Sequence, residues 1–275
     1  MYNRIEHQFV GFINTPSIFN NSNFAGFKLF ELKSNKTFSS SSISQQKFPN
    51  NLVLGKRVEY FFMSAINASK GYELITNNIQ INDEQRTLGE LDFIVKDLKT
   101  KKLLHIELMY KFYVYDPEFQ IELKRWIGPN RKDSLLQKIQ RVNTNQFPLL
   151  HTPEAEKYLK SIDIDSESIQ QQICFKANLF IPKNIQTQKF SQINEDCIIG
   201  YWIHFKDFGD YDQEAFYFFA PEKQDWPIVP ENWEEWINFK DVNEQIKELH
   251  LRKKSPLIWI KKSDGSFERI IVVWW

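Results

Sequence analysis

The sequence predicts an α/β fold in which a mixed β-sheet is flanked by helices. A helical pattern over residues 52–69 comes first, and three strand patterns follow it. A second helical pattern at residues 134–145 and a fourth strand pattern at residues 173–181 complete the order. Because helices and strands that mix in this way bury their apolar faces against each other, the order is typical of an α/β sandwich.

Composition limits the kinds of protein that this chain can be. The 275 residues are 42% hydrophobic and include 24 Phe, 10 Tyr and 8 Trp, which is a composition that folds around a core. The formal net charge is +0, so any attraction for nucleic acid must be local. The 2 Cys give neither a disulfide framework nor a thiol metal motif. Without an apolar signal core or a run of roughly 18 apolar residues, we expect a cytoplasmic protein with no membrane contact.

The chain divides into three predicted parts. Residues 1–50 form an N-terminal lead segment, in which a Ser-rich run at residues 34–46 predicts an exposed loop. Residues 51–183 form the core, and residues 184–275 form a C-terminal extension that packs on the core. Within the extension, strand patterns occur at residues 200–205, 215–219, 257–260 and 269–273, and a partly helical pattern occurs at residues 233–249.

The first predicted helix places a carboxylate beside its apolar stripe. Glu59 is followed at helical spacing by apolar residues such as Phe62 and Ile66. Its side chain can therefore be half-buried against the sheet. The alternative is an ordinary glutamate at the helix edge, neutralised by Lys56 or Arg57, because charged residues usually stay at solvated edges.

Two strand patterns, at residues 89–95 and 104–112, are joined by a short polar segment that predicts a hairpin. Side chains alternate along a strand, so Glu90 and Asp92 share one face of the first strand. In the second strand, Glu107 lies on the face opposite to the apolar side chains. The hairpin therefore brings acidic groups from two strands toward each other.

A turn that is symmetric about Lys99 and Thr100 places Asp92 directly opposite Glu107. Opposed residues of an antiparallel pair have Cβ atoms about 4.5–5.5 Å apart, and like charges at that distance destabilise a sheet. A divalent cation between them removes the repulsion, so Asp92, Glu107 and neighbouring Glu90 suggest a site for Mg²⁺ or Mn²⁺. A slip of one residue puts the two on opposite faces. The alternative is a polar strand face with ordinary cross-strand ion pairs.

Lys111 lies on the Glu107 face, about 13 Å farther along the strand. Its ammonium can hold a scissile phosphate, or it can position and activate a water. His105 shares this face as well, and there it is either a packed strand histidine or a group that supports the acids.

The second predicted helix, at residues 134–145, is expected to be capped by Asp133 and carries an apolar stripe. Basic residues cluster around it: Lys124, Arg125, Arg131, Lys132, Lys138 and Arg141. Acidic residues are interspersed among them, so this is either a phosphate-contact surface or an ordinary solvated face. Seven of the eight Trp follow residue 200. They fit a core better than a stacking surface for nucleobases, because large aromatic side chains mostly build cores and interfaces.

Taken together, a helix Glu, a strand–turn–strand with two acids and a basic helix resemble the core of PD-(D/E)XK nuclease-like proteins. More closely, the chain resembles the bacterial family catalogued as domain of unknown function 1853, which is grouped with that superfamily. The residues that carry this resemblance are Leu88-Gly89-Glu90-Leu91-Asp92-Phe93, His105-Ile106-Glu107-Leu108, Lys111-Phe112-Tyr113, Gly128-Pro129-Asn130, Asp133, Leu135, Lys138, Gln146-Phe147-Pro148-Leu149 and residues 268–275.

The resemblance implies a role for each candidate residue. Asp92 and Glu107 become the metal-binding carboxylates, Glu59 a supporting acid that binds the metal through water, and Lys111 the catalytic lysine. In the superfamily pattern a Lys stands two residues after the Glu, whereas here that position is Met109. Lys111 is displaced from it by one pleat, about 7 Å.

We therefore expect a metal-dependent nuclease-like protein that hydrolyses phosphodiester bonds of DNA or RNA with Mg²⁺ or Mn²⁺. The alternative is a catalytically inactive member of this fold that binds nucleic acid or a protein partner. An active enzyme needs Asp92, Glu107 and Lys111 to converge on one cavity, whereas a binding protein needs only a basic or aromatic surface. In a purely structural protein, the carboxylates would be paired by nearby Lys or Arg.

Overall fold

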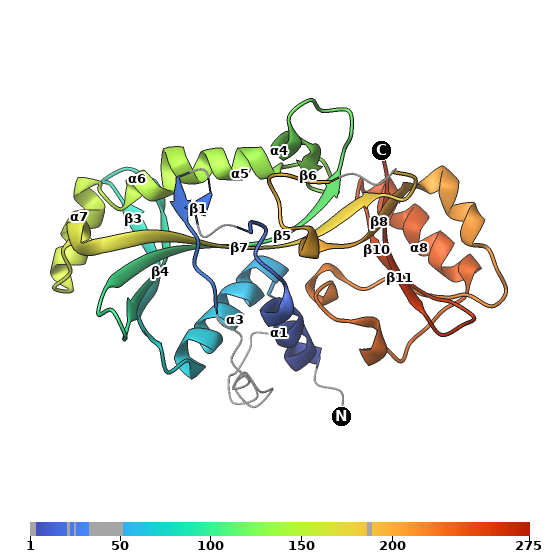
Figure 1. The fold of residues 1–275 in the computed structure, drawn as a ribbon, viewed down its shortest axis with the longest axis horizontal. Helices are drawn as coiled ribbons and strands as arrows, with labels where there is room; N and C mark the ends of the chain where they lie inside the picture. The colour runs from blue at the N-terminus through green and yellow to red at the C-terminus, as the bar shows by residue number, and fades with distance from the viewer. Residues whose placement is uncertain (1–3, 21–22, 25, 33–51, 186–188) are drawn as a thin grey trace.

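The computed structural model describes residues 4–20, 23–24, 26–32, 52–185 and 189–275. The Ser-rich run at residues 34–46 lies outside these residues. The fold is built on a nine-stranded mixed sheet with the order β3-β4-β5-β7-β8-β11-β10-β9, and β6 pairs with β5. Figure 1 shows this sheet extending across the molecule, with helices on both of its faces. The predicted α/β class is confirmed.

The first half of the sheet holds the predicted hairpin. Its strands are β3 (Tyr72–Asn82), β4 (Thr87–Asp97), β5 (Leu103–Tyr115), β6 (Trp126–Ile127) and β7 (Ile169–Pro182). β3, β4 and β5 are antiparallel neighbours, whereas β7 runs parallel to β5 from Leu103 to Val114. Because of this long parallel pairing, β5 is a central strand of the sheet, and β7 pairs with one of its edges.

The last third of the chain continues the same sheet. Its strands are β8 (Ile198–His204), β9 (Tyr217–Phe219), β10 (Leu257–Lys261) and β11 (Phe267–Val273). β8 is parallel to β7, β11 is parallel to β8, and β10 is antiparallel to both β11 and β9. These strands fall in the predicted C-terminal extension, and they join the core by hydrogen bonds between β8 and β7. The edge of β7 offers backbone groups that need partners, and β8 provides them.

Helices cover both faces of the first half of the sheet (Figure 1). One face carries α1 (Arg4–Asn14) and α3 (Leu54–Ala68). The other carries α5 (Leu135–Arg141), a π-helical turn (Val142–Gln146), α6 (Phe147–Leu149) and α7 (Pro153–Ser161). The remaining elements are β1 (Asn23–Phe24), β2 (Phe27–Lys28), α4 (Glu122–Arg125), α8 (Phe239–Leu251) and short 3₁₀ turns at Ser166–Ser168, Glu195–Cys197, Phe205–Tyr211, Lys223–Asp225 and Pro230–Asn232.

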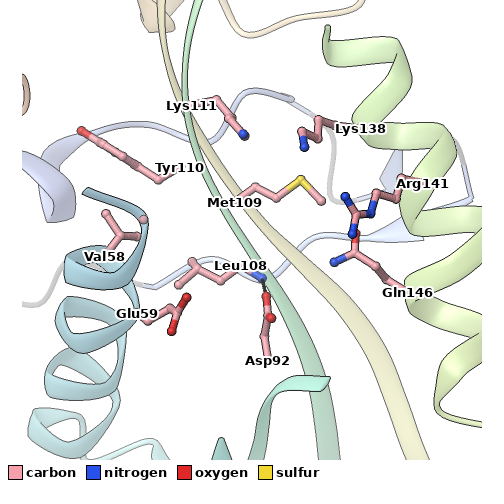
Figure 2. A pocket seen from close by; sticks show the side chains of 11 residues that line it. Val58, Glu59, Asp92, Leu108, Met109, Tyr110, Lys111, Lys138, Arg141 and Gln146 are labelled. Atoms are coloured by element: carbon pink, nitrogen blue, oxygen red, sulfur yellow. Dashed lines mark hydrogen bonds between the residues drawn. The ribbon is translucent and has the colours of Figure 1, made fainter. Parts of the chain in front are cut away.

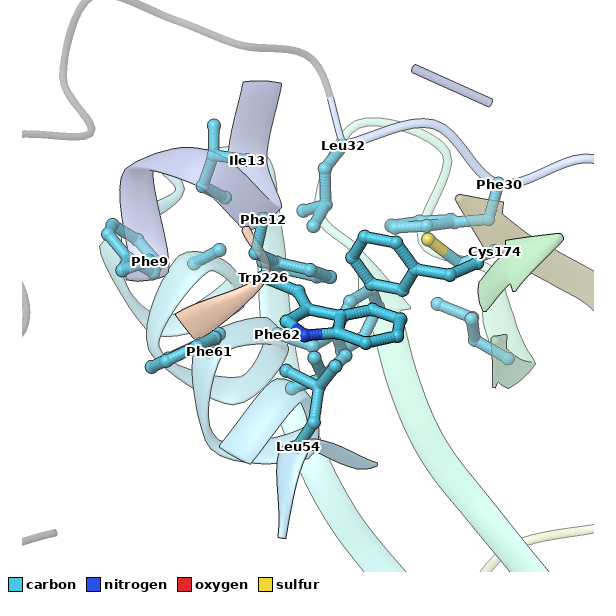
Figure 3. Packing of buried hydrophobic residues seen from close by; sticks show 14 of the residues in the cluster. Phe9, Phe12, Ile13, Phe30, Leu32, Leu54, Phe61, Phe62, Cys174 and Trp226 are labelled. Carbon is cyan, nitrogen blue, oxygen red and sulfur yellow. The ribbon is translucent and has the colours of Figure 1, made fainter. Parts of the chain in front are cut away.

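The stripe of α3 packs as its spacing predicts. Phe61 and Phe62 are fully buried, and the ring of Phe62 lies 4.7 Å from that of Phe93 on β4. Trp226, from the last third of the chain, closes the same cluster beside α1 and α3 (Figure 3). Trp202 and Trp259 are buried as well, so these tryptophans build the core, as expected. Among the described residues, no helix is long and apolar enough to cross a bilayer.

The prediction that Asp133 caps the second helix is wrong. The N-cap of α5 is Ser134, which has an extended backbone and whose hydroxyl accepts a hydrogen bond from the Gln137 N–H at 3.3 Å. The carboxylate of Asp133 instead pairs with Nζ of Lys111. The α-helix also ends at Arg141, where the chain continues as the π-helical turn.

Candidate functional site

The register of the β4–β5 hairpin agrees with the symmetric turn that the sequence predicts. Lys96 pairs with Leu103, and the ladder continues to Phe93 opposite Ile106. It ends there, one pair before Asp92 and Glu107. The two acids therefore lie where β4 leaves β5.

This departure opens a gap in the sheet. β7 occupies one edge of β5, and β4 leaves the other edge after Ile106. β6 takes up that second edge only at Val114 and Tyr115. Between these two short pairings, residues 107–113 of β5 face the gap. A strand edge of this kind presents backbone N–H and C=O groups to whatever lies beside it.

Asp92 lies in the gap. Its Oδ2 accepts a hydrogen bond from the Leu108 N–H at 2.9 Å, drawn as the dashed line in Figure 2. Backbone N–H groups of a strand point along the sheet, so a carboxylate bound to one lies at the strand edge rather than above a face. Asp92 therefore lies beside Glu107 at the strand edge. The two side chains do not stack over the same face of the hairpin.

A break in the strand alternation explains this position. Phe93 contacts Phe62 of α3, whereas a Cβ on Gly89 would lie 2.7 Å from Leu149 of α6, on the other face of the sheet. Two odd-numbered residues of β4 thus face opposite sides. The neighbouring β3 has Asn78 at φ 52°, opposite Asp92, which is a left-handed conformation that kinks a strand.

The gap forms a cavity of about 290 Å³ between α3 and α5. Its lining residues are Gly55, Val58, Glu59, Asp92, Leu108, Met109, Tyr110, Lys111, Lys138, Arg141 and Gln146 (Figure 2). The acids Glu59 and Asp92 lie at one end, and the cations Lys111 and Lys138 lie toward the other. Three of the four predicted catalytic residues, Glu59, Asp92 and Lys111, thus converge on one cavity.

Glu59 is half-buried and already has partners. Its Oε2 lies 2.8 Å from Lys56 Nζ and accepts a hydrogen bond from Asn78 Nδ2 at 2.6 Å. Lys56 also lies 3.7 Å from Glu90. The pairing with Lys56 that the sequence allowed is therefore present, whereas Arg57 donates to other groups. Asn78, held in its left-handed conformation, links Glu59 to the kink opposite Asp92.

Glu107 is fully buried and does not line the cavity. Its Oε1 lies 3.0 Å from His105 Nε2, and Gln146 donates to its Oε2. Gln171 contacts the other ring nitrogen of His105 at 3.2 Å. Burial lowers the pKa of His105 to about 4, so the ring is neutral at pH 7. His105 is thus a packed strand histidine, with its ring 6.0 Å from that of Phe147, and it also contacts Glu107, so both of its predicted roles agree with the structure.

The two central acids have strongly perturbed pKa values. Burial, followed by the charge of Glu107, raises the pKa of Asp92 to about 8. Burial raises the pKa of Glu107 to about 8 as well, and the nearby Glu90 acts in the same direction. Crowded, desolvated carboxylates favour the neutral form unless a cation joins them. Such perturbation is common at functional sites.

Lys111 reaches the cavity but is paired there. Its Nζ lies 3.1 Å from Oδ2 of Asp133, and Lys138 Nζ lies 3.9 Å from the same oxygen. Gly128 packs directly against the Asp133 carboxylate, where a Cβ would collide with it. Met109, at the position of the lysine in the superfamily pattern, is only 7% exposed and packs in an apolar cluster.

The donor set for a metal is small. Among the described residues, no group of three or more His, Cys, Asp or Glu has the arrangement of a metal site. Asp92 and Glu59 face the cavity, and Glu107 lies directly behind Asp92. Mg²⁺ in proteins usually takes one or two carboxylates and completes its shell with waters and substrate phosphates. The acids present fit that kind of site rather than a closed protein cage.

Two polar residues of the cavity had no predicted role. Gln146 appeared only within the family resemblance, and its place on the π-helical turn has no signal in the sequence. Tyr110 was counted as an apolar strand residue, yet its hydroxyl contacts Thr15 and accepts from Asn178, each at 3.1 Å. Both depend on contacts between segments that are distant in sequence, and periodicity cannot show such contacts.

Comparison with known proteins shows which family the chain belongs to. The family model described as Domain of unknown function (DUF1853) matches residues 24–272, and the chain belongs to this family. No match is found among curated proteins or among solved structures.

Proposed function

We propose that this protein is a metal-dependent nuclease-like enzyme of the PD-(D/E)XK type that hydrolyses phosphodiester bonds. The observation that supports this most is the cavity in the sheet gap. There the carboxylates of Glu59 and Asp92 lie opposite the cations Lys111, Lys138 and Arg141. A phosphodiester needs cations to hold its charge and carboxylates to bind the metal. A site with both kinds of group, beside an open strand edge, is suited to DNA or RNA as a substrate.

The metal in this proposal is Mg²⁺ or Mn²⁺. Asp92 would hold it from the cavity, with Glu59 contributing through water. Glu107, the second predicted ligand, is buried outside the cavity lining with its oxygens on His105 and Gln146, so it would have to turn toward the cavity to bind the metal. The raised pKa values of Asp92 and Glu107 fit this assignment, because they mark two acids that lack a neutralising cation. When bound, the metal lowers the pKa of a water and stabilises charge on the phosphate.

The protein groups have separate tasks in this proposal. His105 and Gln146 hold Glu107 in one orientation through its two oxygens. The Leu108 N–H fixes Asp92. The ammonium of Lys111 and the guanidinium of Arg141 attract the phosphate and orient it, since charge-assisted hydrogen bonds are the stronger ones.

A catalytically inactive binding protein is the second candidate, and one observation favours it. Lys111 is bound to Asp133, and the position nearer the acids is the apolar Met109. In that case the basic part of the cavity binds nucleic acid, and the acids are remnants of a site. The same candidate includes binding to a protein partner in place of nucleic acid.

A cleavage assay separates these two. We expect purified protein to cut single- or double-stranded DNA or RNA in Mg²⁺ or Mn²⁺, and Asp92→Asn to remove this activity. If the wild type leaves all four substrates intact across a range of pH, the enzyme proposal fails and the binding candidate takes its place.

A further inference from the structure

One part of the loop at residues 128–133 has no role in the proposed reaction. Asp133, at its end, lies beside the cavity in the sheet gap, because its Oδ2 is 3.1 Å from Lys111 Nζ. Pro129 and Asn130, which belong to the family resemblance, instead line a second pocket, the Pro129 pocket. Its volume is about 580 Å³, within the range of about 300 to 1,000 Å³ that is usual for ligand pockets.

The Pro129 pocket has apolar walls that come from distant parts of the chain. The Trp226 ring is fixed from two sides, because it packs on Phe112 with ring centroids 5.0 Å apart and its Nε1 donates to the Pro221 carbonyl at 3.3 Å. The apolar lining residues are Pro129, Pro221, Trp226, Leu249 and Pro256. Rigid, apolar walls of this kind suit a planar ring such as a nucleobase, since every base has an apolar face that can stack.

Contacts with the last third of the chain hold the loop that forms one wall. The Pro129 carbonyl accepts hydrogen bonds from the Ser255 hydroxyl at 2.8 Å and from Trp275 Nε1 at 3.0 Å. Asn130 Oδ1 accepts from the Ser255 N–H at 2.8 Å. The Arg131 guanidinium lies 3.8 Å from the centroid of the Trp275 ring. The wall is therefore preorganised, which lowers the cost of binding a ligand.

The side chain of Asn130 offers hydrogen-bond donors to the pocket. Its Oδ1 is held by Ser255, whereas its Nδ2 forms no hydrogen bond with the described residues. An amide Nδ2 carries two N–H donors. Donors at this place suit the acceptor nitrogens and carbonyl oxygens at the edge of a nucleobase.

Two lysines add positive charge at the rim of the pocket. Lys223 and Lys254 both line the pocket and are exposed. The ion pairs that lysines form within the described part of the chain involve neither of them. Glu222 also lines the pocket, and its carboxylate accepts from the Gln224 amide. The rim therefore has cations available for an anionic group, such as a phosphate.

We infer that the Pro129 pocket binds one nucleotide of the strand that the enzyme cuts. The base lies against the apolar walls and accepts from Asn130, and the phosphate lies at Lys223 and Lys254. A base inside the pocket is outside any helical stack, so the strand is single at this point.

The loop at residues 128–133 connects the two sites. Asn130 and Asp133 are three residues apart, a separation of at most about 11 Å along an extended chain. One strand can therefore occupy the Pro129 pocket and the cavity in the sheet gap together. This assignment to the strand rests on the proposed function, whereas the nucleotide as the class of ligand rests on the pocket alone.

The test begins with binding in EDTA, where no metal-dependent step contributes. Isothermal titration calorimetry of the full chain compares adenosine 5′-monophosphate with adenosine and with ribose 5-phosphate. The variants are Lys254→Gln and Asn130→Asp, which keeps an oxygen for the Ser255 N–H but replaces the amide Nδ2 with a second carboxylate oxygen. The matched control is Lys240→Gln, which changes an exposed lysine of α8 outside the pocket. Circular dichroism verifies that each variant is folded.

We expect the monophosphate to bind at least about fivefold more tightly than ribose 5-phosphate, because one stacked base contributes that much. Lys254→Gln should weaken the monophosphate by about fivefold, the effect of one exposed charge pair, and leave adenosine unchanged. Asn130→Asp should weaken the monophosphate by more than tenfold, because it removes a donor and adds a like charge. Lys240→Gln should match the wild type. A monophosphate that does not bind, or that binds equally well to Asn130→Asp, overturns the inference.

A fluorescent single-stranded octanucleotide tests the assignment to the strand. The monophosphate should compete with it, and Asn130→Asp should weaken its binding. If the monophosphate depends on Asn130 but does not compete with the octanucleotide, the assignment to the strand is overturned and the ligand is a free nucleotide.

Cleavage in Mg²⁺ provides an independent second arm. For an active enzyme, Asn130→Asp should raise KM more than it lowers kcat, because it touches a nucleotide away from the reacting phosphate. If the wild type does not cleave but its binding of the monophosphate depends on Asn130, the proposed enzyme fails and the nucleotide pocket stands. If it cleaves with a KM that Asn130→Asp leaves unchanged, only the inference fails.

Discussion

The carboxylate of Asp92 accepts a hydrogen bond from the Leu108 N–H at 2.9 Å, just beyond the last paired residues of β4 and β5. A side chain thus takes the place of a backbone carbonyl at the edge of a central strand. The contact satisfies a buried N–H group and fixes an acid in the sheet gap.

Asp92→Asn should abolish cleavage without loss of the fold. Asparagine keeps a carbonyl oxygen that can accept from the Leu108 N–H, but it removes the charge that holds a cation. Because burial of an acid with a raised pKa costs free energy at neutral pH, the variant should be at least as stable as the wild type at pH 8. Thermal unfolding and a nuclease assay on the same preparation measure both effects. Retained cleavage would remove Asp92 from the mechanism.

Stability without metal should fall as pH rises from about 6.5 to about 8. In this range the folded state holds Asp92 and Glu107 protonated, with pKa values of about 8, whereas the unfolded chain has released those protons. The unfolded state then binds fewer protons, so the free energy of unfolding decreases with pH, by at most about 1.4 kcal/mol per pH unit for each group.

The window starts near pH 6.5 because of His105. Its pKa is lowered from 6.5 to about 4. Below pH 6.5 the unfolded chain therefore binds a proton that the folded state does not, and this makes the free energy of unfolding rise with pH. Urea unfolding in EDTA at several pH values measures the slope. Asp92→Asn should flatten it, and an equal slope in this variant would show that other groups are responsible.

Added Mg²⁺ or Mn²⁺ should stabilise the protein at pH 8. A ligand that binds only the folded state adds about 2.7 kcal/mol at 100 times its Kd. A melting curve in millimolar Mn²⁺ is compared with one in NaCl of equal ionic strength, and Asp92→Asn is the control. An unchanged Tm of the wild type would favour the catalytically inactive binding protein.

The position of the lysine can be tested by moving it. Lys111→Ala should lose most of the cleavage, because Lys111 is a predicted catalytic residue and lines the cavity. Met109→Lys restores the spacing of the superfamily pattern and should add little if Lys111 already serves the site. Rates of both variants on one DNA substrate decide this. A marked gain in Met109→Lys would mean that the wild-type site lacks a working lysine.

Local sequence was sufficient for the hairpin and for the helix beside it. The short polar turn defines the register, so residues 93–96 pair as the symmetric turn predicts. The apolar spacing in α3 also predicts which side chains are buried and leaves Glu59 at the edge of the stripe. Both features depend on residues close together in the chain, and the spacing of apolar and polar residues is enough to predict such local contacts.

The tertiary structure decided where the acids and cations lie relative to each other. The left-handed Asn78 and the departure of β4 moved Asp92 into the gap, and the contacts of Glu107 with His105 and Gln146 buried it behind the cavity. Strict alternation along a strand could not show this, because a kink depends on both neighbouring strands.

By itself, the sequence determined the α/β class, the hairpin register and the acidic character of its two strands. Only the tertiary structure joined the last third of the chain to the same sheet and brought Lys111 and Lys138 to the carboxylate of Asp133. The physical reason is the separation along the chain between the residues that make each contact. Hydrogen-bond register and helical stripes are set by neighbours in the chain, whereas strand order and charge clusters come from contacts between distant segments, which bury surface only after the chain has folded.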